Sequence, residues 1–183
     1  MKLARYLIGK RLVHELAQGR VSGRIVETEA YLPGDAAAHS FRGQTARNRS
    51  LFLERGHAYV YFIYGSCWLF NVSSERSGVG AGVLVRALEP LEGIDFMQGR
   101  RGSSRLRDLM RGPGRLSVAL GIDRSHDGLD LCAGGLLFLA SAVRPVANIG
   151  TSVRIGITRD AHRMLRFYER DNPFVSGPQW LNR

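Results

Sequence analysis

Residues 25–49 read Ile-Val-Glu-Thr-Glu-Ala-Tyr-Leu-Pro-Gly-Asp-Ala-Ala-Ala-His-Ser-Phe-Arg-Gly-Gln-Thr-Ala-Arg-Asn-Arg, and the rest of the expected fold is organised around them. The segment opens with β-forming residues and is stopped by Pro33-Gly34-Asp35, which predicts a strand that ends at a turn. Because side chains alternate across a strand, four residues are expected on one face: Ile25, Glu27, Glu29 and Tyr31. That face would carry two carboxylates and a phenol.

The loop after this strand adds an imidazole and a cluster of cations. His39 follows the turn, and Arg42, Arg47 and Arg49 close the segment. A carboxylate can act as a general base and arginines bind phosphates, so the segment is typical of a general-base site beside a phosphate-binding surface. The same residues also fit a solvated sheet edge with a surface histidine, and the segment alone leaves both interpretations open.

Residues 57–74 predict two strands joined near Gly65-Ser66. Alternation places Tyr59 and Tyr61 on one face of the first strand and Tyr64 on the other. Aromatic side chains in strands usually pack in the core. Tyr64 directly precedes the turn, so we expect it near the tip of the hairpin instead.

Residues 82–89 form an apolar run that contains one cation, Arg86. A charged side chain in a buried strand needs a partner, because burying an unpaired charge is costly. That partner is expected to be either a buried carboxylate or the phosphate of a ligand. From Leu88 to Met97 the pattern then favours the entry into a helix.

A strongly basic stretch, residues 99–111, carries Arg100, Arg101, Arg105, Arg107 and Arg111. Gly112-Pro113-Gly114 ends this stretch and predicts a helix over residues 115–120, which begins at Arg115. Backbone N–H groups at a helix start can hold a phosphate. A run of like charges is equally typical of a solvated helix face, and the sequence leaves both interpretations open.

The remaining segments predict short strands and few helices. Helices are expected over residues 2–8 and from Thr45, as a cap, through Phe52. Strands are expected over residues 10–16, 20–31, 136–140, 152–158 and 164–168. This pattern favours an α+β fold: a single domain of residues 1–183, with a curved, mostly antiparallel β-sheet flanked by short helices and a protruding β-hairpin.

The net charge of the 183-residue chain is +10, and all of its 26 cations except Lys2 and Lys10 are arginines. Such a basic surface attracts phosphate backbones. No apolar run approaches the roughly 18 residues of a membrane span, and the N-terminal apolar run is too short for a signal peptide, so an intracellular protein is expected. Cys67 and Cys132 show neither a pairing pattern nor a metal spacing.

Several blocks of the chain, in the same order, resemble the alkyladenine (3-methyladenine) DNA glycosylase family. The blocks are VETEAYLPGDAAAHS, QTARNR, YVYFIYG, NVSS and LVRALEPLEG, and they extend from about Leu3 to about Ser176. The resemblance implies the same α+β fold and a monofunctional DNA glycosylase of base excision repair. It implies that the enzyme flips alkylated or deaminated purines out of duplex DNA and hydrolyses the N-glycosidic bond. The implied substrates are 3-methyladenine, 7-methylguanine, hypoxanthine and ethenoadenine.

The resemblance assigns roles that the residues alone leave open. Alternation cannot separate Glu29 from Glu27, but Glu29 matches the catalytic position of the family and would activate the water that attacks C1′. Arg86 matches the residue close to that water and to the target phosphate. Its charge would keep Glu29 ionised.

The resemblance also assigns residues that contact the damaged nucleotide. Tyr31 and Tyr61 would sandwich the flipped base, with His39 beside them. Asn71 would meet the purine edge where guanine carries its 2-amino group and so disfavour normal guanine. Tyr64 would enter the duplex and replace the flipped nucleotide. Independently of the resemblance, the charge pattern predicts phosphate contacts from Arg42, Arg47, Arg49 and Arg115 and from the basic cluster of residues 100–111.

The expected partner is double-stranded DNA that contains damaged purines, bound by a monomer without a cofactor or a metal. The protein would be intracellular and DNA-associated. Two other classes remain: a non-catalytic nucleic-acid-binding module, and a metal-dependent nuclease that uses Glu27, Glu29 and Asp35. The sequence lacks the His or Asp set expected of a metal cage, which disfavours the nuclease.

Overall fold

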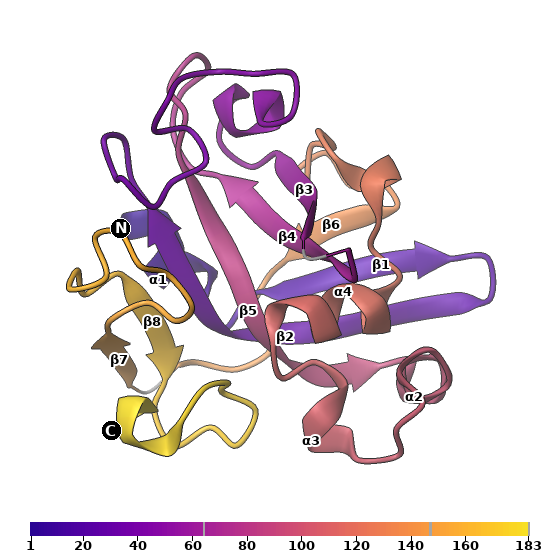
Figure 1. The fold of residues 1–183 in the computed structure, drawn as a ribbon. Coiled ribbons are helices and arrows are strands. Elements are labelled where there is room, and N and C mark those ends of the chain that lie inside the picture. Colours follow the sequence, from indigo (N-terminus) through magenta and orange to yellow (C-terminus); the bar gives the residue numbers. More distant parts are fainter. Residues whose placement is uncertain (64, 147, 183) are drawn as a thin grey trace.

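An antiparallel sheet of eight strands forms the centre of the computed structural model, which describes residues 1–63, 65–146 and 148–182 (Figure 1). The main path of the sheet follows the order β3-β4-β5-β2-β1-β6, while β8 pairs with β2 and β7 pairs with β8. The strands are β1 Arg11–Leu16, β2 Gly19–Tyr31, β3 Ala58–Ile63, β4 Cys67–Ser73, β5 Gly82–Glu92, β6 Leu137–Ala140, β7 Ile149–Ser152 and β8 Arg166–Glu169. The expected α+β fold with a curved, antiparallel sheet is confirmed.

Strand β2 is the axis of this sheet. One edge of it pairs with β5, whereas the other edge is shared by β1 in its first half and by β8 over Glu27–Glu29. The pairing of β2 with β5 shifts its register twice between Ile25 and Thr28. Ile25 packs in the main hydrophobic core together with Ala30, so the expected single face from residue 25 to residue 31 is wrong. A β-bulge adds one unpaired residue to a strand, so the side chains that follow the bulge point to the opposite face of the sheet.

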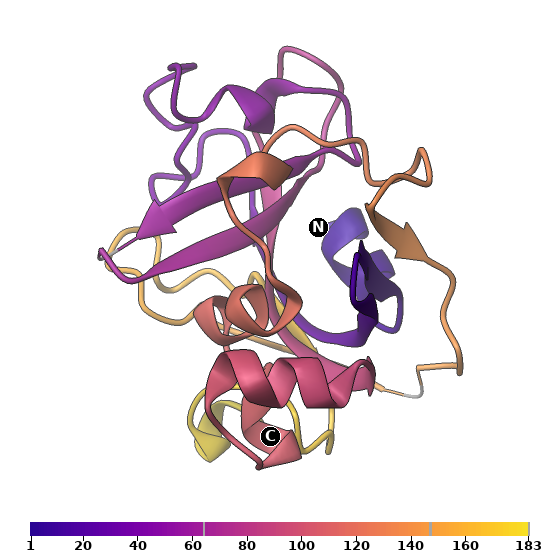
Figure 2. The same ribbon diagram turned by 90° about the vertical axis from the view of Figure 1, so that its right-hand side faces the viewer.

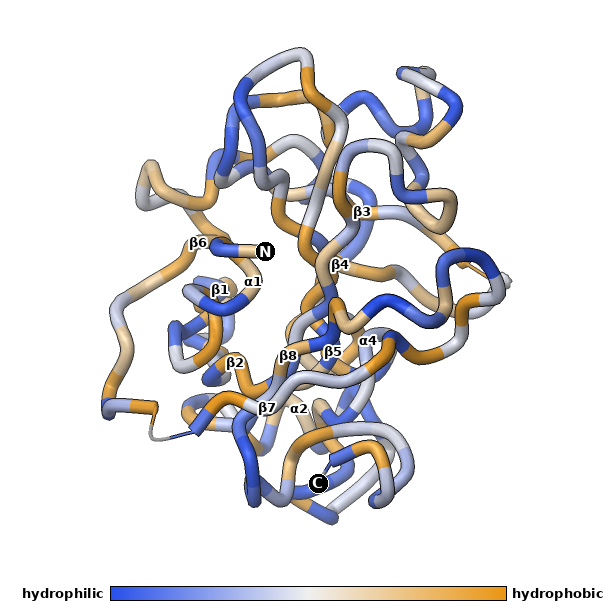
Figure 3. Tube along the Cα trace, turned by 90° about the vertical axis from the view of Figure 1, so that its left-hand side faces the viewer, coloured by the Kyte–Doolittle hydropathy of each residue, from blue (hydrophilic) through white to orange (hydrophobic). Residues whose placement is uncertain are grey.

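Short helices flank the sheet. Helix α1, Lys2–Leu7, contacts β2, and Thr28 Oγ1 donates a hydrogen bond to the carbonyl of Ala4 within α1 at 3.0 Å. Helices α2 Ile94–Arg101, α3 Leu106–Leu109 and α4 Pro113–Leu120 cluster at one end of the sheet (Figure 2). Buried side chains of all four helices join those of the strands in one hydrophobic core, and hydrophobic stretches run through the strands of this region (Figure 3).

The β3–β4 hairpin protrudes from the sheet, as expected (Figure 2). Gly65 adopts φ +62° in the turn, a conformation that favours glycine. Helix α4 packs against the turn end of this hairpin at Gly114, where an added Cβ would come within 2.7 Å of Cys67 Sγ. Glycine therefore allows the helix and the hairpin to approach closely.

Three elements differ from their expected boundaries by three residues or more. Strand β5 continues to Glu92 by pairing with β2, so the helix begins at Ile94, after Gly93, and not within residues 88–93. Strand β7 ends at Ser152, and residues 153–157 are irregular because the Ile155 N–H donates to a Glu29 carboxylate oxygen instead of to a strand. A single 3-10 turn, Arg49–Phe52, follows Thr45, and Asn48, not Thr45, precedes it as its N-cap residue.

Two further 3-10 turns, Arg124–His126 and Gln179–Asn182, complete the fold. Within the three described ranges, no helix combines the length and the apolar character needed to cross a membrane.

Candidate active site

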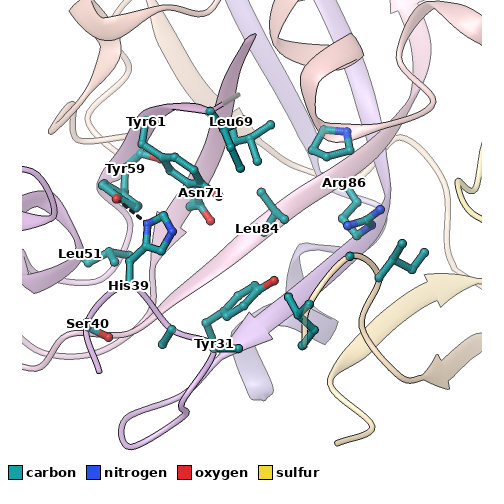
Figure 4. A pocket seen from close by; sticks show the side chains of 17 residues that line it. Tyr31, His39, Ser40, Leu51, Tyr59, Tyr61, Leu69, Asn71, Leu84 and Arg86 are labelled. Atoms are coloured by element: carbon teal, nitrogen blue, oxygen red, sulfur yellow. Dashed lines mark hydrogen bonds between the residues drawn. The ribbon is translucent and has the colours of Figure 1, made fainter. Parts of the chain in front are cut away.

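A cavity of about 330 Å³ opens between the β3–β4 hairpin, β5 and the end of β2 (Figure 4). Its walls also include residues 37–40 of the loop after β2, Pro113 at the start of α4, and residues 155–157. These segments lie far apart in the sequence, and the antiparallel pairing of β2, β5 and β4 brings them together. Most of the lining is apolar or aromatic, which is typical of a site for a small planar ligand.

Aromatic side chains face each other across this cavity. Tyr31, at the end of β2, lies opposite Tyr61 and His39 in Figure 4. The His39 ring packs edge-on against Tyr61 with 4.4 Å between ring centroids, and its Nδ1 lies 2.9 Å from the hydroxyl of Tyr59. Burial lowers the pKa of His39, with Arg47 adding to the effect, so the imidazole is neutral at pH 7. The structure therefore brings together three of the expected ligand-binding residues.

Asn71 lines the same cavity from β4. Its Nδ2 donates a hydrogen bond to the carbonyl of Tyr59 at 3.1 Å, across the β3–β4 pair. This bond fixes the plane of the amide against the hairpin. A fixed polar group in a mostly apolar and aromatic wall is suited to discriminate between ring edges.

Glu27 and Glu29 are both fully buried, but their surroundings differ. Glu27 accepts hydrogen bonds from Arg166 Nε at 2.7 Å, from Arg86 Nε at 3.0 Å and from the Ser176 N–H at 2.6 Å. Burial would raise the pKa of Glu27, but the charges of Arg86 and Arg166 outweigh it and hold the pKa below its usual value. The ionised form of Glu27 is therefore favoured, and the residue is a structural partner of two arginines.

Glu29 is paired less strongly. Its Oε1 accepts from the Ile155 N–H at 2.7 Å and lies 3.2 Å from Arg86 Nη1, and its Oε2 accepts from the Tyr31 hydroxyl at 3.0 Å. Burial raises the pKa of Glu29 above its usual value, although the positive charge of Arg86 opposes this shift. A carboxylate with a raised pKa is better suited to accept a proton than one locked in an ion pair.

The carboxylate of Glu29 lies directly behind the wall of the cavity. Glu29 is not one of the described residues that line the cavity, but its hydrogen-bonding partners Tyr31 and Ile155 and its ion-pair partner Arg86 all line it. Arg86 bridges Glu27 and Glu29, so the expectation of a buried carboxylate partner for this cation is confirmed. The bridge links the structural carboxylate to the one beside the cavity.

The expected DNA-contacting residues are dispersed. Arg42, Arg47 and Arg49 are exposed in the loop after β2, and Arg47 Nη2 donates to the carbonyl of Phe62 in the hairpin at 3.2 Å. Arg49 lines a separate surface hollow, and Arg115 lies on the first turn of α4, 3.4 Å from the carboxylate of Asp108. Tyr64 lies outside the described residues.

Two residues of the site, Ile155 and Tyr59, were not predicted from the sequence. Ile155 contributes a backbone N–H, and Tyr59 holds His39 from a strand 20 residues away. Of the two, only Tyr59 was accessible to the alternation pattern, since it shares a face with Tyr61. Asp35 is engaged by Arg154, and the described residues contain no group of three His, Cys, Asp or Glu side chains arranged to hold a metal ion.

The arrangement as a whole defines a class of protein. An α+β domain with an aromatic cavity, backed by a carboxylate of raised pKa beside an arginine, fits an enzyme that cleaves a bond next to a planar ring. The profile of one family, described as Methylpurine-DNA glycosylase (MPG), matches residues 1–173. The chain belongs to this family and is a hydrolase that acts on N-glycosyl bonds, which favours an enzyme over a non-catalytic binding module.

Relatives from distant bacteria agree with this membership. The chain is 66% identical over 179 residues to a protein of Mesorhizobium japonicum, covering 98% of this chain and 86% of that one. It is 51% identical to a protein of Paraburkholderia phytofirmans (99% and 85% covered) and 48% identical to one of Chlorobaculum tepidum (97% and 86% covered). All three relatives carry the name "Putative 3-methyladenine DNA glycosylase".

Proposed function

We propose that the chain is a monofunctional DNA glycosylase of base excision repair. It removes alkylated or deaminated purines from duplex DNA, namely 3-methyladenine, 7-methylguanine, hypoxanthine and ethenoadenine, and leaves an abasic site. Residues 1–183 form the catalytic domain. The observation that carries this proposal is the position of Glu29, directly behind an aromatic cavity and with a raised pKa.

The cavity is proposed to hold a base that has been flipped out of the duplex, because a stacked base is inaccessible to an enzyme. Tyr31 and Tyr61 would stack on its two faces, and His39 would pack at its side. Alkylation at N3 or N7 makes a purine cationic, and an aromatic face attracts a cation by roughly 0.5–2 kcal/mol. Asn71 would oppose the 2-amino group of guanine and so add discrimination that stacking does not supply.

The chemistry is proposed to be direct hydrolysis. A water held by Glu29 attacks C1′ of the deoxyribose, its proton passes to the carboxylate, and the bond from C1′ to the base nitrogen breaks with its electron pair on the base. A cationic base leaves as a neutral molecule, whereas a neutral base such as hypoxanthine leaves as an anion that takes up a proton from water. Arg86 would hold the carboxylate and stabilise charge near the target phosphate, and no cofactor or metal takes part.

The protruding β3–β4 hairpin is the proposed wedge. Its turn contains Gly65 next to Tyr64, which would fill the space that the flipped nucleotide vacates. Arg47 supports the hairpin through the Phe62 carbonyl, and its charge would also contact a phosphate. The phosphate contacts of Arg42, Arg49 and Arg115 complete the proposed surface, on which a monomer binds duplex DNA inside the cell.

The proposed function is tested with duplexes that carry one hypoxanthine or one ethenoadenine, and with DNA methylated by dimethyl sulfate. The expected products are the free base and a strand that breaks only after alkali. Undamaged duplex of the same sequence is the control. Complete retention of all the damaged bases, under conditions where the protein binds the duplex, would reject the proposal.

Binding to duplex DNA is expected to weaken steeply as salt rises. Each phosphate neutralised by an arginine contributes about −0.9 to the slope of log K against log salt. Arg47→Gln should therefore make the slope shallower by about 0.9. Fluorescence anisotropy with a labelled duplex at several salt concentrations measures this slope.

Arg55→Gln is the matched control for the salt experiment. Arg55 is also exposed, but it pairs with Glu54 and lines a hollow with Met1 and Lys2, away from the cavity. Its replacement should leave the slope unchanged. A flat salt dependence of the unaltered protein would contradict the proposed phosphate-binding surface.

Base release is expected to depend on the ionisation of Glu29. Because burial raises the pKa of Glu29 above 4.5, the carboxylate becomes protonated at a higher pH than an exposed glutamate does. A protonated Glu29 cannot accept the proton of the water, so the rate should rise with pH through this pKa and then level off. Single-turnover rates on methylated DNA between pH 4.5 and 8 measure the midpoint, and a rate that falls over this acid range would contradict the assignment.

A further inference from the structure

The guanidinium of Arg154 covers one face of the Tyr31 ring. Its Cζ lies 4.6 Å from the ring centroid, and its side chain is completely buried. Tyr31 lines the cavity, whereas Arg154 is not among the described residues that do so. The arginine therefore lies on the side of the ring that is turned away from the cavity, and the opposite face is left for a ligand.

The same guanidinium binds backbone carbonyls and a side-chain carboxylate, and its Nη2 also donates to the carbonyl of Asp160 at 3.4 Å. Nη1 donates to the carbonyl of Ala30 in β2 at 3.0 Å, and the group forms a two-point ion pair with Asp35, in which Nη2 lies 3.0 Å from Oδ1. Asp35 belongs to the loop that leads to His39. A planar guanidinium can stack on a ring and donate in its plane at the same time, which an ammonium cannot do.

Arg154 also fixes the segment that contacts Glu29. The next residue, Ile155, donates its N–H to Glu29 Oε1 at 2.7 Å, and residues 155–157 line the cavity. Strand β7 ends at Ser152, so this segment is not held by strand pairing. The side chain of Arg154 supplies the anchor instead.

We propose that Arg154 is a positioning residue that fixes the stacking ring of Tyr31 and the carboxylate of Glu29 in their positions relative to each other. It does so by stacking behind the ring, by bonding to Ala30 and Asp35, and by fixing the Ile155 N–H. This inference rests on the proposed function, since it assigns Glu29 the role of the base.

Replacement of Arg154 is expected to raise the pKa of Glu29. A hydrogen bond from an N–H to a carboxylate favours the ionised form, so a weaker bond from Ile155 raises the pKa of Glu29 further. The charged and titratable groups that face Glu29 are Arg86 from β5 and Glu27 and Tyr31 from β2. Of these, Tyr31 is stacked on Arg154, and its hydrogen bond also favours the ionised carboxylate, so a displaced Tyr31 shifts the pKa of Glu29 in the same direction.

The test is Arg154→Lys, which keeps a positive charge beside Asp35 but loses the planar stack and the forked ion pair. The single-turnover rate on ethenoadenine-containing duplex, at saturating enzyme, should fall by roughly 10–100-fold, as expected for a displaced catalytic group. The acid midpoint of the rate should also move to higher pH. Binding to undamaged duplex should stay the same.

Arg163→Gln is the control. Arg163 Nη1 lies 3.7 Å from the same Asp35 carboxylate, but its interactions in the structure are with Asp35 and Asp160, not with Tyr31. Its replacement removes a charge next to Asp35 and should leave both the rate and the acid midpoint unchanged. If Arg154→Lys does not fold, the double variant Arg154→Gln/Asp35→Asn removes both charges of the buried pair and carries the same expectation.

The outcomes separate this inference from the proposed function. If the unaltered protein releases no damaged base, the proposed function fails. If it does release base and Arg154→Lys changes only the melting temperature, Arg154 is merely structural and the inference is overturned. A lower rate with an unchanged acid midpoint also overturns it, because the link to Glu29 would be absent.

Discussion

Replacement of Glu29 with glutamine is expected to lower the single-turnover rate of base release by roughly 10²–10⁴-fold, the usual contribution of a general base. Glutamine has the same shape and can still accept a hydrogen bond from the Ile155 N–H, but it cannot take the proton of the attacking water. Affinity for duplex DNA should therefore persist. Rapid-quench kinetics with excess enzyme on a hypoxanthine-containing duplex measure the rate, and anisotropy measures the affinity.

The pH profile of the same variant provides an internal control. The acid limb of the unaltered enzyme should disappear in Glu29→Gln, because the residue that titrates is gone. Near-normal base release by this variant would remove Glu29 from the mechanism. A larger loss of rate in correctly folded Glu27→Gln would transfer the role to the neighbouring carboxylate.

Glu27→Gln is expected to act on stability instead. Glu27 neutralises Arg86 and Arg166, and removing one partner of a buried ion pair typically costs about 3–5 kcal/mol in the free energy of unfolding. For a protein of this size, such a loss lowers the melting temperature by roughly 6–20 °C. Differential scanning calorimetry measures the change, and Glu29→Gln is the matched substitution on the same strand.

Glu27→Gln should lower the melting temperature more than Glu29→Gln because more cations lose their partner. Glu27 binds two arginines and the backbone N–H of Ser176, whereas Glu29 binds Arg86 only in part and has a raised pKa. Equal melting temperatures for the two variants would contradict the assignment of Glu27 as the structural carboxylate.

Local pattern was sufficient to predict the framework of the site. The turn residues 33–35 mark the end of β2, Gly65 marks the hairpin, and alternation places Tyr59 and Tyr61 together on the face that lines the cavity. The apolar run around Arg86 predicted a partner for this cation, either a buried carboxylate or a ligand phosphate, and the structure supplies the carboxylate. These features depend on neighbours in the chain, which a sequence displays directly.

The parts of the fold and of the site that the sequence did not predict depend on contacts between residues far apart in the chain. Glu27 and Glu29 are equivalent by alternation, and they differ because Arg166, 139 residues away, binds only the first of them. Arg154 reaches Asp35 across 119 residues, and the register shifts in β2 remove Ile25 from the expected face. Neither a bulge nor a long-range ion pair leaves a periodic signal, so residues 153–157 were expected as a strand.

The central claim is that water activated by Glu29, and not an amine of the protein, attacks C1′. The side-chain amines of the chain are Lys2 and Lys10, and Lys10 Nζ lies over the ring of Tyr6, 4.5 Å from its centroid. Neither lysine is among the described residues that line the cavity. An amine nucleophile forms a Schiff base that borohydride reduces to a stable covalent complex.

The most direct measurement is therefore single-turnover excision from a labelled hypoxanthine-containing duplex in the presence of borohydride, with and without later alkali. We predict release of free base, an intact abasic strand that breaks only in alkali, and no covalent protein–DNA complex. A trapped complex, or strand breaks before alkali is added, would contradict the water mechanism and assign the attack to Lys10 or the α-amino group.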